Sequence, residues 1–315
     1  MYKIFISLSL FALLFCQPAQ AQKTLPAGIN TIRSIAFDDQ HRMWVGTFGN
    51  GLWLSDSAGI RRFYDSAADK PFSMINNLMV QGGHLYIATA GGGCQRLNLQ
   101  NLKFDDLRQA PGFEKLHALA HTSTGKTLIG SVGSGTAALE KDTWTTLSES
   151  QNLQISWVNS IAEWRGELWL GTASGLYRNH LDKPWKPVFA EISRAINCLI
   201  VVNDILYAGT TDRGVYAVQP DKYPQQLSGT VGPINFLVPF SDRLIAGGQL
   251  GLWSIKIVQA DEISCEIADA KSAALSPKKI LYVGTSDGKL YESDDSLAFR
   301  HIMSFTENGL EEHKR

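Results

Sequence analysis

The sequence has little cysteine, no excess of charge of one sign and, beyond its first residues, no long apolar run. Four cysteines occur among 315 residues, and 29 basic side chains face 30 acidic ones. The apolar run over residues 4–15 is too short to cross a bilayer as a helix, and no other stretch approaches that length. Balanced charge argues against nucleic acid and against an anionic lipid surface. We therefore expect no membrane insertion and no nucleic-acid partner.

Motifs for metal or catalytic chemistry are also missing. The chain has no CxxC pair, no DxDxDG calcium loop and no G-x-S-x-G turn. His117 and His121 are four residues apart, which on a strand places them roughly 13 Å apart, too far for one ion. We expect no metal, no cofactor and no catalytic residues. Cys94, Cys198 and Cys265 are interpreted as buried small side chains, with one disulfide plus a leftover thiol as the alternative.

The first residues have the pattern of a secretory signal peptide. One positive charge at Lys3 precedes the apolar run, and Ala19 and Ala21 form an A-x-A cleavage site. We predict a signal peptide over residues 1–21, cleaved after Ala21, and a periplasmic or secreted protein. Lipidation at Cys16 is the weaker alternative, because the bulky Phe15 precedes it.

A short pattern recurs seven times in the remaining chain. The pattern is three mostly apolar residues, then a small residue, then usually a Thr, as in Leu168–Thr172. A Gly follows four or five positions after the small residue, as Gly175 follows Gly171. The small residues stand at positions 46, 88, 130, 171, 209, 247 and 284, so the spacings are 42, 42, 41, 38, 38 and 37. A period near 40 in a β-rich sequence predicts one four-stranded propeller blade per repeat.

The predicted fold is therefore all-β, a seven-bladed β-propeller of four-stranded antiparallel blades. It forms a single domain over residues 22–315, with no room for a second one. The blades are expected at about 29–65, 72–108, 113–148, 155–190, 192–228, 230–267 and 269–306.

Two features of the repeat have physical reasons. The small residue fits the centre of the ring, where neighbouring backbones approach closely. The second glycine of each repeat is placed in the turn to the third strand, where positive φ is needed. The recurring aromatics at Trp44, Tyr86, Trp169, Tyr207 and Tyr282 are interpreted as packing between blades.

The segments WVGTFGNGL, LWLGTASGLY, LYAGTTDRGVY and LYVGTSDGKLY resemble the two-component-regulator propeller repeat. The resemblance covers about residues 29–306, with degenerate third and sixth copies. It implies the propeller fold and extracytoplasmic recognition, because such propellers form the periplasmic sensory part of hybrid histidine kinases and also occur in secreted or cell-surface proteins. The sequence departs from those sensors in having one propeller and no kinase, so the resemblance does not imply signalling.

Polar residues near the start of each innermost strand form the first candidate site. If the strands are in register, they make a polar ring at one mouth of the central channel, able to bind a sugar or a carboxylate. Its members are Arg33, Asn77, His117, Asn159, Asn197, Asn235 and Lys271. The alternative is that these side chains satisfy loop backbone groups, which asparagine does readily. Trp157 offers an aromatic face to a sugar, or packs under a loop.

Turns between the second and third strands share a face with the links between blades, and form a second candidate surface. The residues singled out there are Phe48, Asn50, Asp212, Arg213, Gln249 and Asp287.

Three functions follow. The preferred one is a non-catalytic extracytoplasmic module that binds a glycan or a protein partner on its loop face. The second is a scaffold in an envelope or type IX secretion-like complex. The third is an enzyme similar to virginiamycin B lyase, also a seven-bladed propeller, with catalytic groups gathered at the channel mouth. Fold alone does not choose between them.

Overall fold

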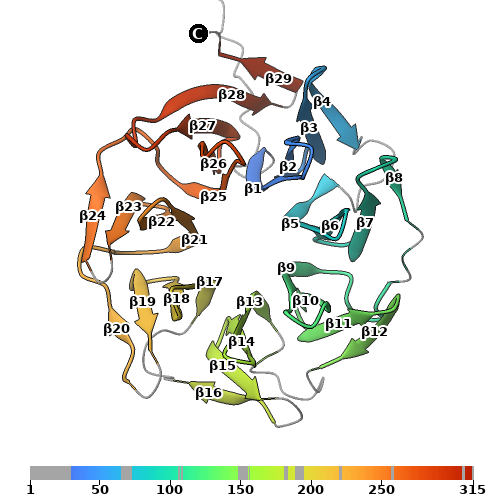
Figure 1. Cartoon of the computed structure of the whole chain (residues 1–315), viewed down its shortest axis with the longest axis vertical. Helices are drawn as coiled ribbons and strands as arrows, with labels where there is room; N and C mark the ends of the chain where they lie inside the picture. The colour runs from blue at the N-terminus through green and yellow to red at the C-terminus, as the bar shows by residue number, and fades with distance from the viewer. Residues whose placement is uncertain are drawn as a thin grey trace, which may run out of the picture.

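Seven antiparallel sheets stand around one central axis in a computed structural model of the chain (Figure 1). The structure describes residues 30–64, 73–105, 107, 109–147, 155, 157–180, 184–188, 195–219, 222–256, 259–306 and 309–313. The predicted seven-bladed β-propeller is confirmed. The predicted signal peptide lies outside the described residues.

Each sheet is one blade, and its strands follow the chain outward from the axis. The strands of the first four blades are β1 (Thr31–Phe37), β2 (Met43–Phe48), β3 (Leu52–Asp56) and β4 (Gly59–Tyr64); β5 (Ile75–Gln81), β6 (His84–Thr89), β7 (Cys94–Asn98) and β8 (Lys103–Phe104); β9 (Leu116–His121), β10 (Thr127–Ser131), β11 (Thr136–Glu140) and β12 (Thr143–Thr146); β13 (Val158–Trp164), β14 (Glu167–Thr172), β15 (Gly175–His180) and β16 (Lys186–Val188).

The last three blades repeat this plan, and the seventh carries a fifth strand that the sequence analysis did not predict. Their strands are β17 (Ile196–Val202), β18 (Ile205–Thr210), β19 (Val215–Val218) and β20 (Gln225–Gln226); β21 (Ile234–Phe240), β22 (Arg243–Gly248), β23 (Gly251–Lys256) and β24 (Gln259–Ile263); β25 (Ala270–Leu275), β26 (Leu281–Thr285), β27 (Lys289–Ser293), β28 (Arg300–Thr306) and β29 (Gly309–Glu312). β29 pairs with β28 and extends the blade outward (Figure 1).

The alternating strand directions give the ring two distinct faces. The turns between second and third strands lie beside the links that enter the next blade, as the bridges Ala90–Lys115 and Val132–Trp157 show. We call this end the loop face. The turns between first and second strands, and between third and fourth, lie at the other end, which we call the opposite face.

The second glycine of the repeat has positive φ in all seven blades, as predicted (Gly51, Gly93, Gly135, Gly175, Gly214, Gly251 and Gly288). The hydroxyl that follows the small residue closes the same turn. Thr210 Oγ1, for example, donates to the carbonyl of Gly214 at 2.9 Å and accepts from the backbone N–H of Arg213 at 2.9 Å. In six blades a Thr or Ser hydroxyl and the turn glycine therefore build the tight turn of the loop face, whereas the sixth blade has Gly248 at the hydroxyl position.

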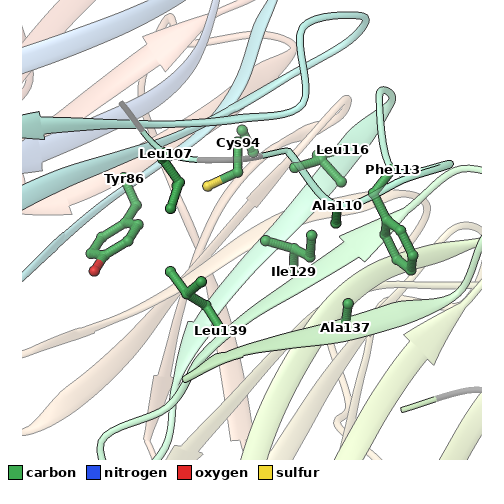
Figure 2. Packing of buried hydrophobic residues seen from close by; sticks show 10 residues of the cluster. Tyr86, Cys94, Leu107, Ala110, Phe113, Leu116, Ile129, Ala137 and Leu139 are labelled. Carbon is green, nitrogen blue, oxygen red and sulfur yellow. The ribbon is translucent and has the colours of Figure 1, made fainter. Parts of the chain in front are cut away.

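Neighbouring blades bury their faces against each other. Figure 2 shows one such core, where Tyr86 and Cys94 of the second blade meet Leu116, Ile129 and Leu139 of the third. The small residue of each repeat makes the closest approach. A Cβ built on Gly209 would lie 2.8 Å from Ile234 Cγ2 of the next blade, and one on Gly171 would lie 2.8 Å from Ile196 Cγ2. The predicted close approach at these positions is confirmed.

The ring closes between the first and seventh blades by the same face-to-face packing. Thr31 Oγ1 donates to the carbonyl of Ser286 at 2.9 Å, and Ser272 Oγ donates to the carbonyl of Ile32 at 2.8 Å. Deeper in the interface, Trp53 and Phe305 meet edge to face at 5.2 Å. All strands of the seventh blade come from the C-terminal part of the chain, so non-covalent contacts hold the two ends of the ring together.

Candidate functional site

Each innermost strand carries one bulged residue near its start, on the loop face. The register shifts by one residue in all seven blades, for example between Ile32 and Ser34 and between Ile196 and Cys198. A bulge leaves its extra residue outside the ladder and re-aims its side chain. The bulged residues are Arg33, Asn76, His117, Asn159, Asn197, Asn235 and Lys271.

Six of these positions were predicted, and the second blade differs by one residue. The sequence predicts Asn77 in the ring, whereas the structure puts Asn76 at the bulge and Asn77 in the ladder opposite Ala88. Two adjacent asparagines are chemically identical, so only the register of the strand distinguishes them. Asn77 Nδ2 instead reaches the backbone carbonyl of His117, at 3.4 Å.

The four bulged asparagines join each blade to the next. Each donates its side-chain N–H to the carbonyl of the residue that precedes the bulge in the following blade. The bonds are Asn76–Leu116 at 2.8 Å, Asn159–Ile196 at 3.0 Å, Asn197–Ile234 at 3.0 Å and Asn235–Ala270 at 2.8 Å. We call these four bonds the asparagine latches. For these residues the structure favours the interpretation as backbone partners over that as ligand contacts.

The other three bulged residues are two cations, Arg33 and Lys271, and one histidine that becomes a cation on protonation, His117. They lie on the first, seventh and third blades, respectively. Arg33 Cζ lies 5.2 Å from the centre of the Phe48 ring, and Lys271 Nζ lies 2.6 Å from Asp269 Oδ1. Arg33 is exposed to solvent in the channel, yet the surrounding blades displace enough water to lower the pKa of its guanidinium, an effect that Asp269 partly offsets.

His117 links the third blade to an exposed tryptophan. Its ring meets Trp157 edge to face at 6.2 Å, and Trp157 is 45% exposed. Burial lowers the pKa of His117, and the positive charge of Arg33 lowers it further. Arg33 and His117 therefore act on each other electrostatically at the same mouth of the channel. We call Arg33, His117, Lys271, Asp269 and Trp157 the mouth cluster.

The residues predicted on the loop face are spread around the ring and do not form one site. Asn50 is buried, and its Nδ2 donates to the carbonyl of Thr306 at 3.0 Å, so it contributes to ring closure. Asp212 and Arg213 are exposed neighbours, with side chains 3.8 Å apart.

Asp287 lies 2.8 Å from Lys289 Nζ. Burial alone would raise the pKa of Asp287, but its bonds to Lys289 and Thr285 lower it.

Two of the predicted loop-face residues do reach the mouth cluster. Phe48 lies beneath the Arg33 guanidinium. The backbone carbonyl of Gln249 accepts from the N–H of Asp269 at 3.1 Å and so helps to position that carboxylate. Asp269 was not predicted from the sequence, because it lies two residues before the bulged Lys271 and outside the repeat pattern.

Within the described ranges, no group of three or more His, Cys, Asp or Glu side chains is placed to hold a metal ion. Nor does the described part of the chain contain a helix long and apolar enough to cross a membrane.

Residues 28–49 match the family model described as "Two component regulator propeller". A comparison with curated proteins finds no match. Among solved structures, the chain is similar to the extracellular domain of a hybrid two component system from B. thetaiotaomicron, with a TM-score of 0.68 and 17% identity over 83% of this chain and 38% of that one. This chain thus spans about two fifths of that structure's length.

Two other similar structures differ widely in origin. The computationally designed Ika8 protein has a TM-score of 0.65 and 14% identity, over 91% of this chain and 94% of that one. A streptogramin B lyase has a TM-score of 0.68 and 10% identity, over 83% and 92%. Such low identities establish the shared propeller fold and nothing about chemistry.

Proposed function

We propose that this propeller, whose first blade carries a two component regulator propeller repeat, is an extracytoplasmic and non-catalytic module that binds an acidic glycan at its loop-face mouth. One observation carries the proposal. Of the seven bulged residues, four are asparagines whose side chains hydrogen-bond to the next blade. The other three, Arg33, His117 and Lys271, are positioned around the same opening.

The mouth cluster has the chemistry that a carboxylated sugar needs. Arg33 and Lys271 can donate charge-assisted hydrogen bonds to carboxylates, which are stronger than neutral ones. Trp157 offers an exposed ring for the apolar face of a sugar, and His117 packs against it from the edge. Asp269 is paired with Lys271 and can accept from sugar hydroxyls with its second oxygen. The chain as a whole is almost neutral, so this positive charge is a local feature.

Two observations support a place outside the cytoplasm. The sequence of residues 1–21 has the pattern of a signal peptide. A structure similar to this one is the extracellular domain of a two component system. Likeness to the lyase supports the fold only.

Calorimetric titration with a matched pair of ligands tests the proposal. Oligogalacturonate carries one carboxylate per sugar, and its methyl-esterified form has the same backbone without charge. We expect the wild-type chain to bind the charged form, and Arg33→Gln to weaken that binding roughly tenfold because one charge-assisted contact is lost. The exposed Arg213→Gln, on the turn of the fifth blade, is the control and keeps full affinity. Equal binding of both ligands, or none of either, rejects the acidic-glycan proposal.

A protein partner is the second candidate, because two apolar side chains are exposed on the loop face of the sixth blade. Val231 is 54% exposed and Leu250 is 57% exposed. Such a pair fits the rim of a protein interface in an envelope complex better than a sugar site. A photo-crosslinking residue at position 250, introduced in the native host, is expected to capture one defined partner, and Val231→Asp is expected to abolish that crosslink. Loss of capture with Arg33→Gln but not with Val231→Asp would place the partner at the channel mouth instead.

A further inference from the structure

A hollow lies on the opposite face, away from the channel mouth, between the fourth and fifth blades. It has a volume of about 370 Å³, within the range of small-molecule sites. One part of its wall comes from the end of β13, the turn after it, and β14 to β16. The other part consists of Val218 at the end of β19, Gln219, Lys222 and Tyr223. Because the two blades contribute different walls, the hollow depends on the packing between them.

Two tryptophans form a rigid wall of this hollow. The Trp164 and Trp169 rings are 5.3 Å apart, and Trp164 Nε1 donates to Asp204 Oδ1 of the fifth blade at 2.9 Å. A guanidinium covers each ring, with Arg165 Cζ 5.6 Å from Trp164 and Arg178 Cζ 5.7 Å from Trp169. These contacts hold the aromatic wall in place before any ligand enters, which lowers the cost of ordering on binding.

The polar side chains around the hollow carry more positive than negative charge. Arg165, Arg178 and Lys222 line it together with a single carboxylate, Glu167. Arg165 pairs with Asp204, and Arg178 lies 3.3 Å from Glu167. Lys222 instead donates to a neutral acceptor, Gln219 Oε1, at 2.9 Å. Among the residues that the structure describes, no carboxylate is paired with this ammonium group, which can therefore bind a ligand carboxylate.

Tyr223 completes the entrance. It lies next to Lys222 in the chain, it lines the hollow, and it is 67% exposed. An aromatic ring at the rim, buried valines at positions 188 and 218, and a tryptophan wall suit a planar apolar body.

We infer that this hollow is a second binding site, for a small planar apolar molecule that bears one carboxylate, held by Tyr223 and the tryptophan wall and paired with Lys222. The site lies on the face opposite the channel mouth and is independent of the proposed glycan site. It gives the propeller two ligand classes, one on each face.

Calorimetric titration of the full chain with 2-naphthoate and 2-naphthamide tests the inference, since the two probes share a shape and differ in charge. We expect both to bind and naphthoate to bind more tightly. Lys222→Gln is expected to weaken naphthoate roughly threefold to tenfold and to leave naphthamide unchanged, because only the carboxylate uses the ammonium. Tyr223→Ala is expected to weaken both probes roughly tenfold, while Tyr223→Phe keeps the ring and the affinity.

Lys278→Gln is the matched control, because Lys278 is exposed on a turn of the seventh blade at the same face. It is expected to bind both probes as the wild type does, and the thermal midpoint of every variant is measured to confirm folding. Absence of naphthoate binding at about 5 mM overturns the inference. So does an equal effect of Lys222→Gln on both probes. Neither result bears on oligogalacturonate binding at the other face.

Discussion

Gly284 of the seventh blade lies directly against Ile32 of the first, although the two residues come from opposite ends of the chain. A Cβ built on Gly284 would lie 2.6 Å from Ile32 Cβ and 2.9 Å from Ser272 Oγ. Ser272 in turn donates to the carbonyl of Ile32. The small residue of the last repeat is thus part of the contact that closes the ring.

Gly284→Ala should destabilise the closed ring. The added methyl group cannot be accommodated without moving backbone, and such overpacking costs about 1–3 kcal/mol. The free energy of unfolding from chemical denaturation is the measurement. Gly91→Ala is the control, because nothing lies within 4 Å of a Cβ built there. A loss no larger than that of the control would show that the ring does not close through this contact.

Asn197→Ala should cost stability but not glycan affinity. It removes the latch to the Ile234 carbonyl, a partly buried hydrogen bond worth about 1 kcal/mol. Asn197→Asp should cost more at neutral pH, because it sets a carboxylate against that carbonyl. Denaturation and oligogalacturonate titration of both variants are compared. Lower affinity of a folded Asn197→Ala protein would return this residue to the binding site.

His117→Asn should make the protein more stable. In the latched blades the bulged asparagine bonds the residue before the next bulge, and in the third blade that acceptor is the carbonyl of Val158. A fifth latch should raise the free energy of unfolding by about 0.5–1.5 kcal/mol. His117→Ala, which removes the imidazole and adds no donor, is the matched comparison. Equal free energies of unfolding for the two variants would contradict the prediction, because they would show that the new asparagine forms no stabilising bond to Val158.

Binding of oligogalacturonate should strengthen as the pH falls from about 7 to about 5, where sugar carboxylates remain ionised. Burial and Arg33 lower the pKa of His117, so the unliganded mouth holds a neutral imidazole at neutral pH. A bound anion favours the protonated form, and binding therefore takes up a proton. Affinity is measured across this range for the wild type and for His117→Asn, which should show a flatter pH dependence.

The same shift predicts the sign of the stability change without ligand. Because the folded pKa of His117 lies below the unfolded value, the unfolded chain binds more protons as the pH falls through the unfolded pKa near 6.5. The contribution of His117 to stability is therefore present above that pH and lost below it. A wild-type protein that gains stability relative to His117→Asn on acidification would contradict the lowered pKa.

The thiols of Cys94 and Cys198 should resist alkylation in the folded protein. Burial raises the pKa of each to about 12, and both are free in the structure. Since the thiolate is the reactive form, iodoacetamide at pH 8 should modify them at least about a hundredfold more slowly than in denaturant. Peptide mass spectrometry measures the rates. A disulfide joining either cysteine would disprove the prediction.

The sequence by itself determined the blade count and the radial place of each repeat. Gly46, Gly171 and Gly209 recur because every blade meets its neighbour in the same way, and a constraint repeated seven times is visible in one sequence. The positive-φ glycines, such as Gly175, follow from the same local rule. The approximate position of the ring at the channel mouth also came from counting along the repeat.

Only the tertiary structure decided which of the seven bulged residues at the channel mouth hydrogen-bond to the next blade. Asn197 and Arg33 hold equivalent positions, but one reaches a carbonyl of the next blade and the other lies over Phe48. The choice between Asn76 and Asn77, the burial of Asn50 at the closure, and the hollow beside Trp169 likewise depend on contacts between blades. A repeat pattern encodes what each blade shares with the others, whereas these features arise where one particular blade meets the next.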